Sequence, residues 1–297
     1  MKQVLSKAEM FFHRFSDRII ERRTRQWFEL SKNYFANGAL EDALTCLKKI
    51  LPIKYNFPSA YYLMAEIMMP GENYLDILSR FHNYLKPQSY VEIGVGKGDS
   101  LALAQHPTVS IGIDPFPHIE KKIRSFAKIY PMPSDEFFEN YNLFTELGIN
   151  NLSLAFIDGL HHSEQVLKDF INLERYADDK TVIIIHDCLP ICKMVASRND
   201  NTVFWTGDTW KLILFLIKYR PDLDINVVPT PPSGLSIITK CDPNSTLLIE
   251  KYDQFVSGQL QQNLPYDYLD SLEGKMFMSL YKIVPNEWHE IVKLLQH

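Results

Sequence analysis

The sequence has few cysteines, no apolar stretch of membrane length and no excess of positive charge. Its four cysteines lack the paired spacing of a zinc site, so we expect reduced thiols in a cytoplasmic protein. The N-terminus shows no apolar signal core, and we expect no membrane span. A net charge of −5 gives no general attraction to nucleic acid, which argues against a nucleic-acid partner.

What remains is the composition of a globular protein with a large core. Of the 297 residues, 46% are hydrophobic and 23% are charged, which is enough for one or two domains. We expect a helical accessory region over residues 1–73, an α/β domain over 74–242 and a helical extension over 243–297.

The accessory region shows helical periodicity. Residues 1–25 place apolar side chains on one side of a helix, which we expect to dock or to pair. From Trp27 the pattern resembles a tetratricopeptide helix pair, and Tyr61 begins a second copy 34 residues later. An ordinary helical hairpin explains the same residues. Because such repeats rarely stand alone, the region is expected to pack on the core, on a second copy or on a protein partner.

A glycine-rich turn at residues 94–98 is the first functional signal. An apolar run at 90–93 predicts a buried strand before it, and apolar residues at 101–104 predict a helix after it. Glycines at this turn allow positive φ and a close approach of backbone to ligand. The sequence therefore predicts strand, tight turn and helix around a polar, nucleotide-like ligand, although a loop built only for tightness would look similar.

The glycine spacing distinguishes between nucleotides. A fold that binds a dinucleotide pyrophosphate needs Gly-x-Gly-x-x-Gly, but here the third glycine, Gly98, comes one residue early and Asp99 follows it. This argues against an NAD-dependent oxidoreductase. The pattern Glu92-x-Gly94-x-Gly96-x-Gly98 resembles the first motif of class I S-adenosylmethionine-dependent methyltransferases, and the resemblance implies that these residues bind the cofactor.

Further cofactor contacts are expected at the ends of the next strands. Asp114 follows an apolar run at 109–113, about 20 residues after the turn, where an acid accepts hydrogen bonds from ribose hydroxyls. A short strand is expected at 127–131. Ser134 reads as the cap of the next helix, with Asp135 in its first turn. The methyltransferase resemblance places Ser134 and Asp135 next to the adenine ring.

Two later strands are each followed by acids and histidines. The runs at 152–157 and 181–185 predict buried parallel strands, whose carboxyl ends meet at one edge of the sheet. Four side chains should therefore share one crevice: Asp158, His161, His186 and Asp187. A histidine there can act as a base, or it can be structural and only hydrogen-bond the aspartates.

Several separated motifs give a more specific resemblance over residues 80–240. Residues 156–169, the pair at 186–187 and the stretch 205–211 are similar to a bacterial branch of class I methyltransferases, related to enzymes that O-methylate sugars in macrolides and glycans. The resemblance implies that Asp158 binds magnesium and that His161 removes the hydroxyl proton. The remaining metal ligands would be His186 and Asp187, although imidazole suits softer ions better than magnesium.

The rest of the chain completes the fold. Strands at 225–228 and 235–239 predict an antiparallel hairpin that closes a doubly wound, mostly parallel, Rossmann-like sheet. The loop at 189–206 is the candidate substrate lid, and the substrate residues expected beyond it are Asp208, Trp210 and Lys211. Apolar residues after 243 suggest terminal helices.

These patterns together predict an S-adenosylmethionine-dependent O-methyltransferase that acts on a sugar, a glycan or another small hydroxylated metabolite. The sulfonium methyl is already activated, so the enzyme must align an oxygen with it and remove a proton, with or without a divalent metal. The alternative is a non-catalytic scaffold that binds the cofactor and recruits a partner through the N-terminal helices.

Overall fold

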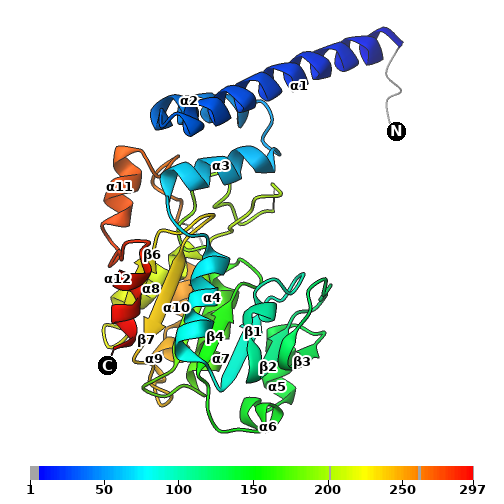
Figure 1. The fold of residues 1–297 in the computed structure, drawn as a ribbon. Helices are drawn as coiled ribbons and strands as arrows, with labels where there is room; N and C mark the ends of the chain where they lie inside the picture. Colours follow the sequence, from blue (N-terminus) through cyan, green and yellow to red (C-terminus); the bar gives the residue numbers. More distant parts are fainter. Residues whose placement is uncertain (1–6, 201, 260–261, 297) are drawn as a thin grey trace.

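The computed structural model describes residues 7–200, 202–259 and 262–296. Its centre is one seven-stranded sheet in the order β3-β2-β1-β4-β5-β7-β6 (Figure 1). The strands are β1 (Ser89–Ile93), β2 (Gln105–Ile113), β3 (Arg124–Tyr130), β4 (Leu154–Ile157), β5 (Val182–His186), β6 (Asp224–Val228) and β7 (Leu235–Thr239). The first five strands pair in parallel, and β7 is antiparallel to both its neighbours. The predicted doubly wound sheet with a closing hairpin is confirmed.

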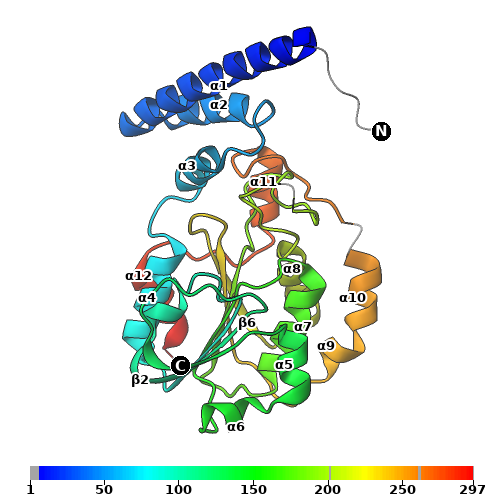
Figure 2. The same cartoon turned by 90° about the vertical axis from the view of Figure 1, so that its right-hand side faces the viewer.

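Helices cover both faces of the sheet (Figure 2). One face carries α4 (Tyr74–Leu85) and α12 (Trp288–Ile291), and the other carries α5 (Ser134–Asn140), α7 (Ser163–Glu174), α8 (Trp210–Tyr219) and α10 (Tyr252–Gln259). The chain after β3 also contains α6 (Leu143–Leu147), α9 (Leu247–Glu250) and α11 (Leu272–Met278), with a short 3-10 helix η2 (Val292–Leu295) near the C-terminus.

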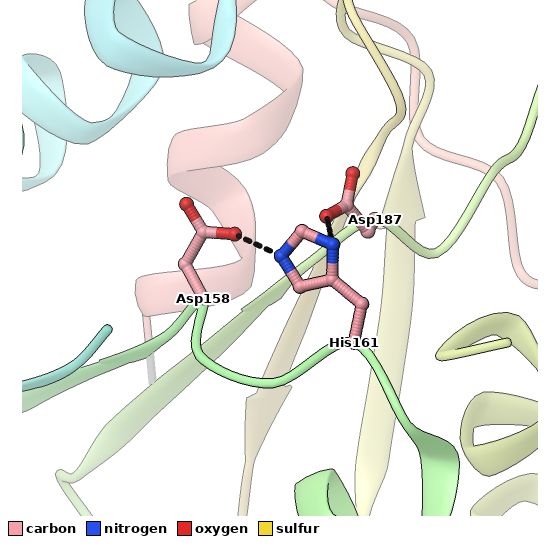
Figure 3. A group of neighbouring side chains, drawn as sticks. All are labelled: Asp158, His161 and Asp187. Atoms are coloured by element: carbon pink, nitrogen blue, oxygen red, sulfur yellow. Dashed lines mark ion pairs between the residues drawn. The ribbon is translucent and has the colours of Figure 1, made fainter. Parts of the chain in front are cut away.

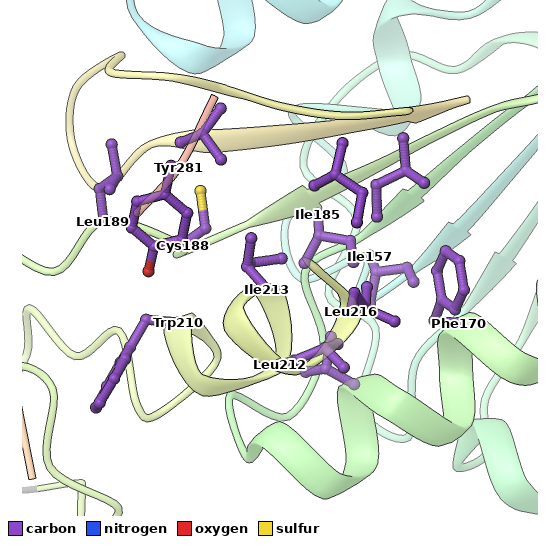
Figure 4. Packing of buried hydrophobic residues seen from close by; sticks show 14 of the residues in the cluster. Ile157, Phe170, Ile185, Cys188, Leu189, Trp210, Leu212, Ile213, Leu216 and Tyr281 are labelled. Atoms are coloured by element: carbon purple, nitrogen blue, oxygen red, sulfur yellow. The ribbon is translucent and has the colours of Figure 1, made fainter. Parts of the chain in front are cut away.

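The central strands are buried on both sides because they lie between these layers. Every residue of β4 and β5 is buried, as expected for parallel strands covered by helices. Phe170 of α7 and Leu212 and Leu216 of α8 pack in the same cluster as Ile157 and Ile185 of the sheet (Figure 4). This packing fixes the carboxyl ends of β4 and β5, where the polar crevice was predicted.

The helix predicted after the glycine turn is wrong. The structure has only a 3-10 turn, η1 (Leu101–Leu103), before β2 begins at Gln105. The six residues between Gly98 and Gln105 amount to less than two helical turns, so a helix here would be too short to cover the face of the sheet. The face that this helix would have covered is packed instead by α4 and α12, whose Phe81 and Trp288 rings lie 5.4 Å apart between centroids.

The N-terminal region contains α1 (Lys7–Ala36), α2 (Leu40–Ile50) and α3 (Pro58–Met68). Residues 1–6 of the predicted first helix lie outside the described residues. The described helix runs unbroken through Trp27 to Ala36, packs on α2 and α3, and projects its N-terminal end away from the sheet (Figure 1). Tyr61 of α3 stacks on Phe204 at 5.3 Å, which joins this region to the core. The tetratricopeptide likeness stays a prediction.

Two further properties concern the whole described chain. The four cysteines are free and buried. Among the described helices, none combines the length and the apolar character that crossing a membrane requires.

A buried histidine of α4 predicts a pH dependence of stability. His82 is 6% exposed, neither ring nitrogen has a partner among the described residues, and burial lowers its pKa to about 4 from 6.5. Only the unfolded chain binds this proton between pH 6.5 and 4, so the stability contribution is lost as pH falls through that window, by up to about 3 kcal/mol. Urea unfolding of His82→Phe should show a weaker decline than the parent over that range. Parallel curves would contradict this.

Candidate active site

Two adjoining cavities lie along the carboxyl edge of the sheet. One, of about 680 Å³, is lined by the glycine turn, Asp114, Ser134 and Asp135, and we call it the cofactor cavity. The other, of about 420 Å³, is lined by the ends of β4 and β5, the 203–206 loop and α3, and we call it the acceptor cavity. Tyr74 and Asp158 line both cavities. The two spaces therefore meet at the end of β4.

The glycine turn has the close backbone approach that its sequence predicted. Gly94 has φ +90°, and a Cβ there would lie 2.1 Å from the carbonyl oxygen of Asp158. Asp114 holds the turn from the next strand: its Oδ2 accepts hydrogen bonds from the N–H groups of Val95 (2.9 Å) and Gly96 (2.8 Å). The turn is thus fixed between β2 and β4.

Two of the predicted cofactor residues do not line the cavity. Glu92 is fully buried and accepts hydrogen bonds from the hydroxyls of Tyr90 and Ser100. Burial raises the pKa of Glu92 to about 8 although both hydroxyls oppose the change. Gly98 has φ +80° and faces the side chain of Ile119. Glu92 and Gly98 therefore support the shape of the turn from behind.

Ser134 and Asp135 line the cofactor cavity, but Ser134 is not a helix cap. It is the first residue of α5, after Pro133, and its hydroxyl donates to Asp169 at 2.6 Å. The proline holds the cap position, so the serine side chain is free to turn toward α7. Asp135 accepts from Lys168 at 2.9 Å and from Gln165 at 2.8 Å. Asp169 was not foreseen from the sequence.

Four polar side chains meet at the end of β4 and β5, and Figure 3 shows His161 between two of them. Its Nε2 lies 3.5 Å from Oδ1 of Asp158, and its Nδ1 lies 3.2 Å from Oδ2 of Asp187. His186 places its Nδ1 3.0 Å from the same oxygen of Asp158. Asp187 has φ +60°, an unusual conformation for aspartate that often marks functional sites.

The charges in this cluster compensate one another. Burial would lower the pKa of His161, but the carboxylates of Asp187 and Asp158 outweigh it and raise the pKa to about 9. Burial would raise the pKa of Asp158, but His186 and His161 hold it below its ordinary value. Burial raises the pKa of Asp187 despite the two imidazoles. In the absence of ligands, His161 is therefore mainly an imidazolium at neutral pH.

The loop that follows β5 holds His161 in place. The ring of His161 stacks on Trp205 at 5.1 Å, and its Nδ1 lies 3.0 Å from the Trp205 carbonyl oxygen. Because a carbonyl only accepts, Nδ1 carries the proton and donates there. At Gly207, which has φ +58°, a Cβ would lie 1.9 Å from the carbonyl oxygen of His161. Only glycine lets the loop pass so close.

The three predicted substrate residues lie outside the acceptor cavity. Asp208 is 0% exposed and accepts from the N–H of Ser163 (2.8 Å), from Arg198 (2.8 Å) and from Lys211 (3.0 Å). Trp210 and Lys211 are also buried. Asp208, just before α8, is directed into the fold because its carboxylate accepts a hydrogen bond from the N–H of Ser163, the first residue of α7. We therefore do not include Asp208, Trp210 or Lys211 in the site.

The cluster can also be tested as a metal site. The predicted ligands were Asp158, His186 and Asp187, but the group whose ligand atoms lie within 4.8 Å of one another is Asp158, His161 and Asp187. His186 instead directs Nδ1 to Asp158 and has Nε2 3.3 Å from the Ser233 hydroxyl. Two carboxylates beside imidazole fit a divalent transition ion, whereas magnesium prefers oxygen ligands alone.

Several lining residues gave no signal in the sequence. Tyr74 is the first residue of α4 and stacks on His186 at 4.3 Å. Tyr62 and Glu66 reach the acceptor cavity from α3, and Phe204 lies beside Tyr62. These residues read as ordinary helix and loop positions, because only the docking of α3 on the core brings them to the cavity.

The strand order, with β7 antiparallel between β5 and β6 and a glycine turn after β1, defines a class I methyltransferase fold. Residues 91–188, about one third of the chain, match a family model described as a methyltransferase domain. This segment of the chain is therefore similar to methyltransferase domains, and it lies in a sheet with the class I methyltransferase strand order.

Comparisons of the whole chain are more distant. None of the curated proteins matches it significantly. Similar solved structures include cofactor-bound Rv0187 from MTB, at 13% identity over 62% of this chain and 89% of that one, with a TM-score of 0.45. The O-methyltransferase TomG from Streptomyces achromogenes, in complex with SAM, has 10% identity over 56% and 78%, with a TM-score of 0.42. An O-methyltransferase from Bacillus cereus, in complex with SAH, has 12% identity over 73% and 99%, with a TM-score of 0.39. Because these scores are low, the fold assignment depends on the strand order, and the methyltransferase likeness depends on the match of residues 91–188.

Proposed function

We propose that the protein transfers the methyl group of S-adenosylmethionine to a hydroxyl group of a sugar, a glycan or another small metabolite. One observation carries the proposal: the cofactor cavity and the acceptor cavity adjoin at Asp158 and Tyr74, with the imidazole of His161 lining the acceptor side. A sulfonium methyl at this junction would face an oxygen held beside a base.

The cofactor cavity offers a matching set of contacts. The sheet order places the end of β4 at the junction, and then β1, β2 and β3 in succession away from it. The methionine part of the cofactor would lie along Gly94 and Gly96, and the ribose hydroxyls at Asp114. Adenine would lie near Ser134 and Asp135, which follow β3.

The proton of the acceptor hydroxyl would pass to Nε2 of His161. The opposite nitrogen, Nδ1, already donates to the Trp205 carbonyl and to Asp187, so the neutral tautomer leaves Nε2 free to accept. Asp158 and Asp187 orient the ring and stabilise the imidazolium that forms. Stacking on Trp205 keeps the ring from turning away.

The acceptor cavity favours an uncharged or cationic molecule. Its described lining includes the carboxylates of Glu66, Asp158 and Asp187, and no lysine or arginine. The rings of Tyr62 and Tyr74 add apolar faces on which a sugar ring can lie. Phosphorylated acceptors should therefore be poor substrates, because the three carboxylates of the lining outnumber its two imidazoles.

A divalent ion is compatible with the same residues, held by Asp158 and Asp187. Bound there, it would lower the pKa of the acceptor hydroxyl. Turnover of the EDTA-treated protein, measured with and without added Mn²⁺, Zn²⁺ or Mg²⁺, tests this. Two carboxylates alone predict a response to Mg²⁺ as well as to Mn²⁺, whereas coordination by His161 would favour Zn²⁺ and leave no free base. Full activity after chelation would remove the metal from the proposal.

The decisive experiment is production of S-adenosylhomocysteine. The full-length protein is incubated with S-adenosylmethionine and a panel of methyl glycosides, amino sugars, catechols and sugar phosphates, and the product is quantified by mass spectrometry. We expect turnover with neutral or amino acceptors and little with phosphates. Tight cofactor binding without turnover across the panel would instead support the scaffold alternative.

The ribose role of Asp114 makes a separate prediction. Asp114→Ala removes the acceptor of two N–H groups in the turn and of the proposed ribose bonds. Affinity for S-adenosylhomocysteine should fall at least about tenfold, because each hydrogen bond to a charged group contributes roughly 1.5–3 kcal/mol. Calorimetry measures the loss. Asp76→Ala, an exposed acid on α4 outside both cavities, is the matched control.

A further inference from the structure

Asp169 of α7 is a buried carboxylate in the wall of the cofactor cavity. It is 1% exposed and lines that cavity together with Ser134, Asp135 and Gln165. Ser134 follows β3, whereas the acceptor cavity lies at the ends of β4 and β5. Asp169 therefore belongs to the end of the cofactor cavity farthest from methyl transfer.

The two oxygens of Asp169 have different surroundings. Oδ1 accepts hydrogen bonds from the hydroxyl of Ser134 at 2.6 Å and from the amide of Gln165 at 3.2 Å. Oδ2 is buried and has no hydrogen-bond partner among the residues that the structure describes. A buried carboxylate oxygen left without a donor is costly, so a ligand donor at this position would be stabilising.

S-adenosylmethionine has three groups of hydrogen-bond donors, which lie at different positions along the cofactor. The α-ammonium belongs to the methionine end, and the ribose hydroxyls belong to Asp114 at the end of β2. The exocyclic 6-amino group is the remaining donor, and it lies on the base, at the β3 end. Phe116, which is 87% exposed, also lines this cavity and offers a ring face for a purine.

We propose that Oδ2 of Asp169 accepts a hydrogen bond from the 6-amino group of the cofactor's adenine, which makes Asp169 a specificity-determining residue for the base. The inference rests on the proposed cofactor site. It assigns to Asp169 a contact distinct from those expected of Ser134 and Asp135.

The electrostatics of the site agree with this role. Burial raises the pKa of Asp169 to about 7, although Ser134 and Gln165 donate to the carboxylate and oppose the change. Of the charged neighbours, Asp135 on α5 raises the pKa and Lys168 on α7 lowers it. An amino group that donates to Oδ2 would favour the ionised carboxylate. The hydrogen bond would then offset the desolvation of this carboxylate and increase the affinity for the ligand.

The test compares two ligands that differ at this donor and at the neighbouring N1, which carries a proton only in the 6-oxo base. Calorimetry measures the affinity of the parent protein for S-adenosylhomocysteine and for S-inosylhomocysteine, in which a 6-oxo group replaces the 6-amino group. The parent should prefer the adenosyl ligand at least about tenfold. In Asp169→Asn the preference should shrink at least about tenfold, because the amide N–H can donate to the 6-oxo oxygen.

The control is Asp99→Asn, which removes a carboxylate from the same cavity at the glycine turn and should keep the parental ratio. An unchanged ratio in folded Asp169→Asn would overturn the inference. If that variant does not fold, the parent still decides: equal affinity for both ligands overturns the inference. Failure of the parent to bind S-adenosylhomocysteine would instead reject the proposed cofactor site.

Discussion

His161→Asn should reduce methyl-transfer turnover at least about a hundredfold while cofactor affinity stays at the parental value. The substitution removes the nitrogen that we propose accepts the acceptor's proton, and general-base catalysis typically contributes a factor of about 10² to 10⁴. Cofactor affinity should persist because His161 lines the acceptor cavity and not the cofactor cavity. Single-turnover formation of S-adenosylhomocysteine and calorimetry measure the two quantities separately.

The neighbouring histidine provides a matched control. His162 precedes α7 and directs its Nε2 to the carbonyl oxygen of Arg198, 3.1 Å away, outside both cavities. His162→Asn should keep turnover within a few-fold of the parent. Parental turnover in His161→Asn would eliminate the proposed base and leave His161 a structural role between Asp158 and Asp187.

The pH profile of the parent follows from the same geometry. The base must be neutral, and the nearby carboxylates raise the pKa of His161 to about 9. Activity at limiting acceptor should therefore increase with pH toward about 9 and then level off, since this profile reports the free enzyme. A profile already flat from pH 7 would show that His161 does not titrate as the base.

The sequence predicted the sheet because its strands are short, apolar and bounded by turns. Those signals are local. The predicted bounds of β7 match the observed ones, and the predicted β1 lies within the observed strand. The glycine turn and the aspartates at strand ends were also visible, because parallel strands deliver their carboxyl ends to one edge. The false helix after Gly98 shows the limit. Apolar spacing at 101–104 fits a helix, but these residues form only a 3-10 turn before β2 begins.

The remaining parts of the site depend on long-range packing. Tyr62 and Glu66 line the acceptor cavity only because Tyr61 of α3 stacks on Phe204 of a loop more than a hundred residues away in sequence. Asp169 was not singled out from the sequence, because only the packing of α5 brings Ser134 against it. Asp208 lies in the stretch 205–211 that carries the family resemblance, yet its buried carboxylate accepts a hydrogen bond from the N–H of Ser163. A single sequence carries no record of such contacts.

Loss of one carboxylate at the far end of α7 should destabilise the whole fold. Arg220, which ends α8, is 1% exposed and makes a two-bond ion pair with Glu174, at 2.8 and 2.7 Å. Glu174 is 4% exposed and also accepts from the N–H of Asp242 at 3.2 Å. Glu174→Ala leaves a guanidinium buried with one carboxylate fewer. We expect a loss of about 3–5 kcal/mol in the free energy of unfolding, measured by urea denaturation.

Two further variants separate the buried charge from the loss of packing. Asp222 also binds Arg220, but its side chain is 52% exposed, so Asp222→Ala should cost at most about 1 kcal/mol. The double variant Glu174→Leu with Arg220→Met removes both buried charges and should recover much of the stability lost in Glu174→Ala. If the double variant is as unstable as Glu174→Ala, the destabilisation comes from lost packing between α7 and α8. Recovery would show that an unpaired buried guanidinium is the cause, and that the ion pair joins the two helices that cover β4 and β5.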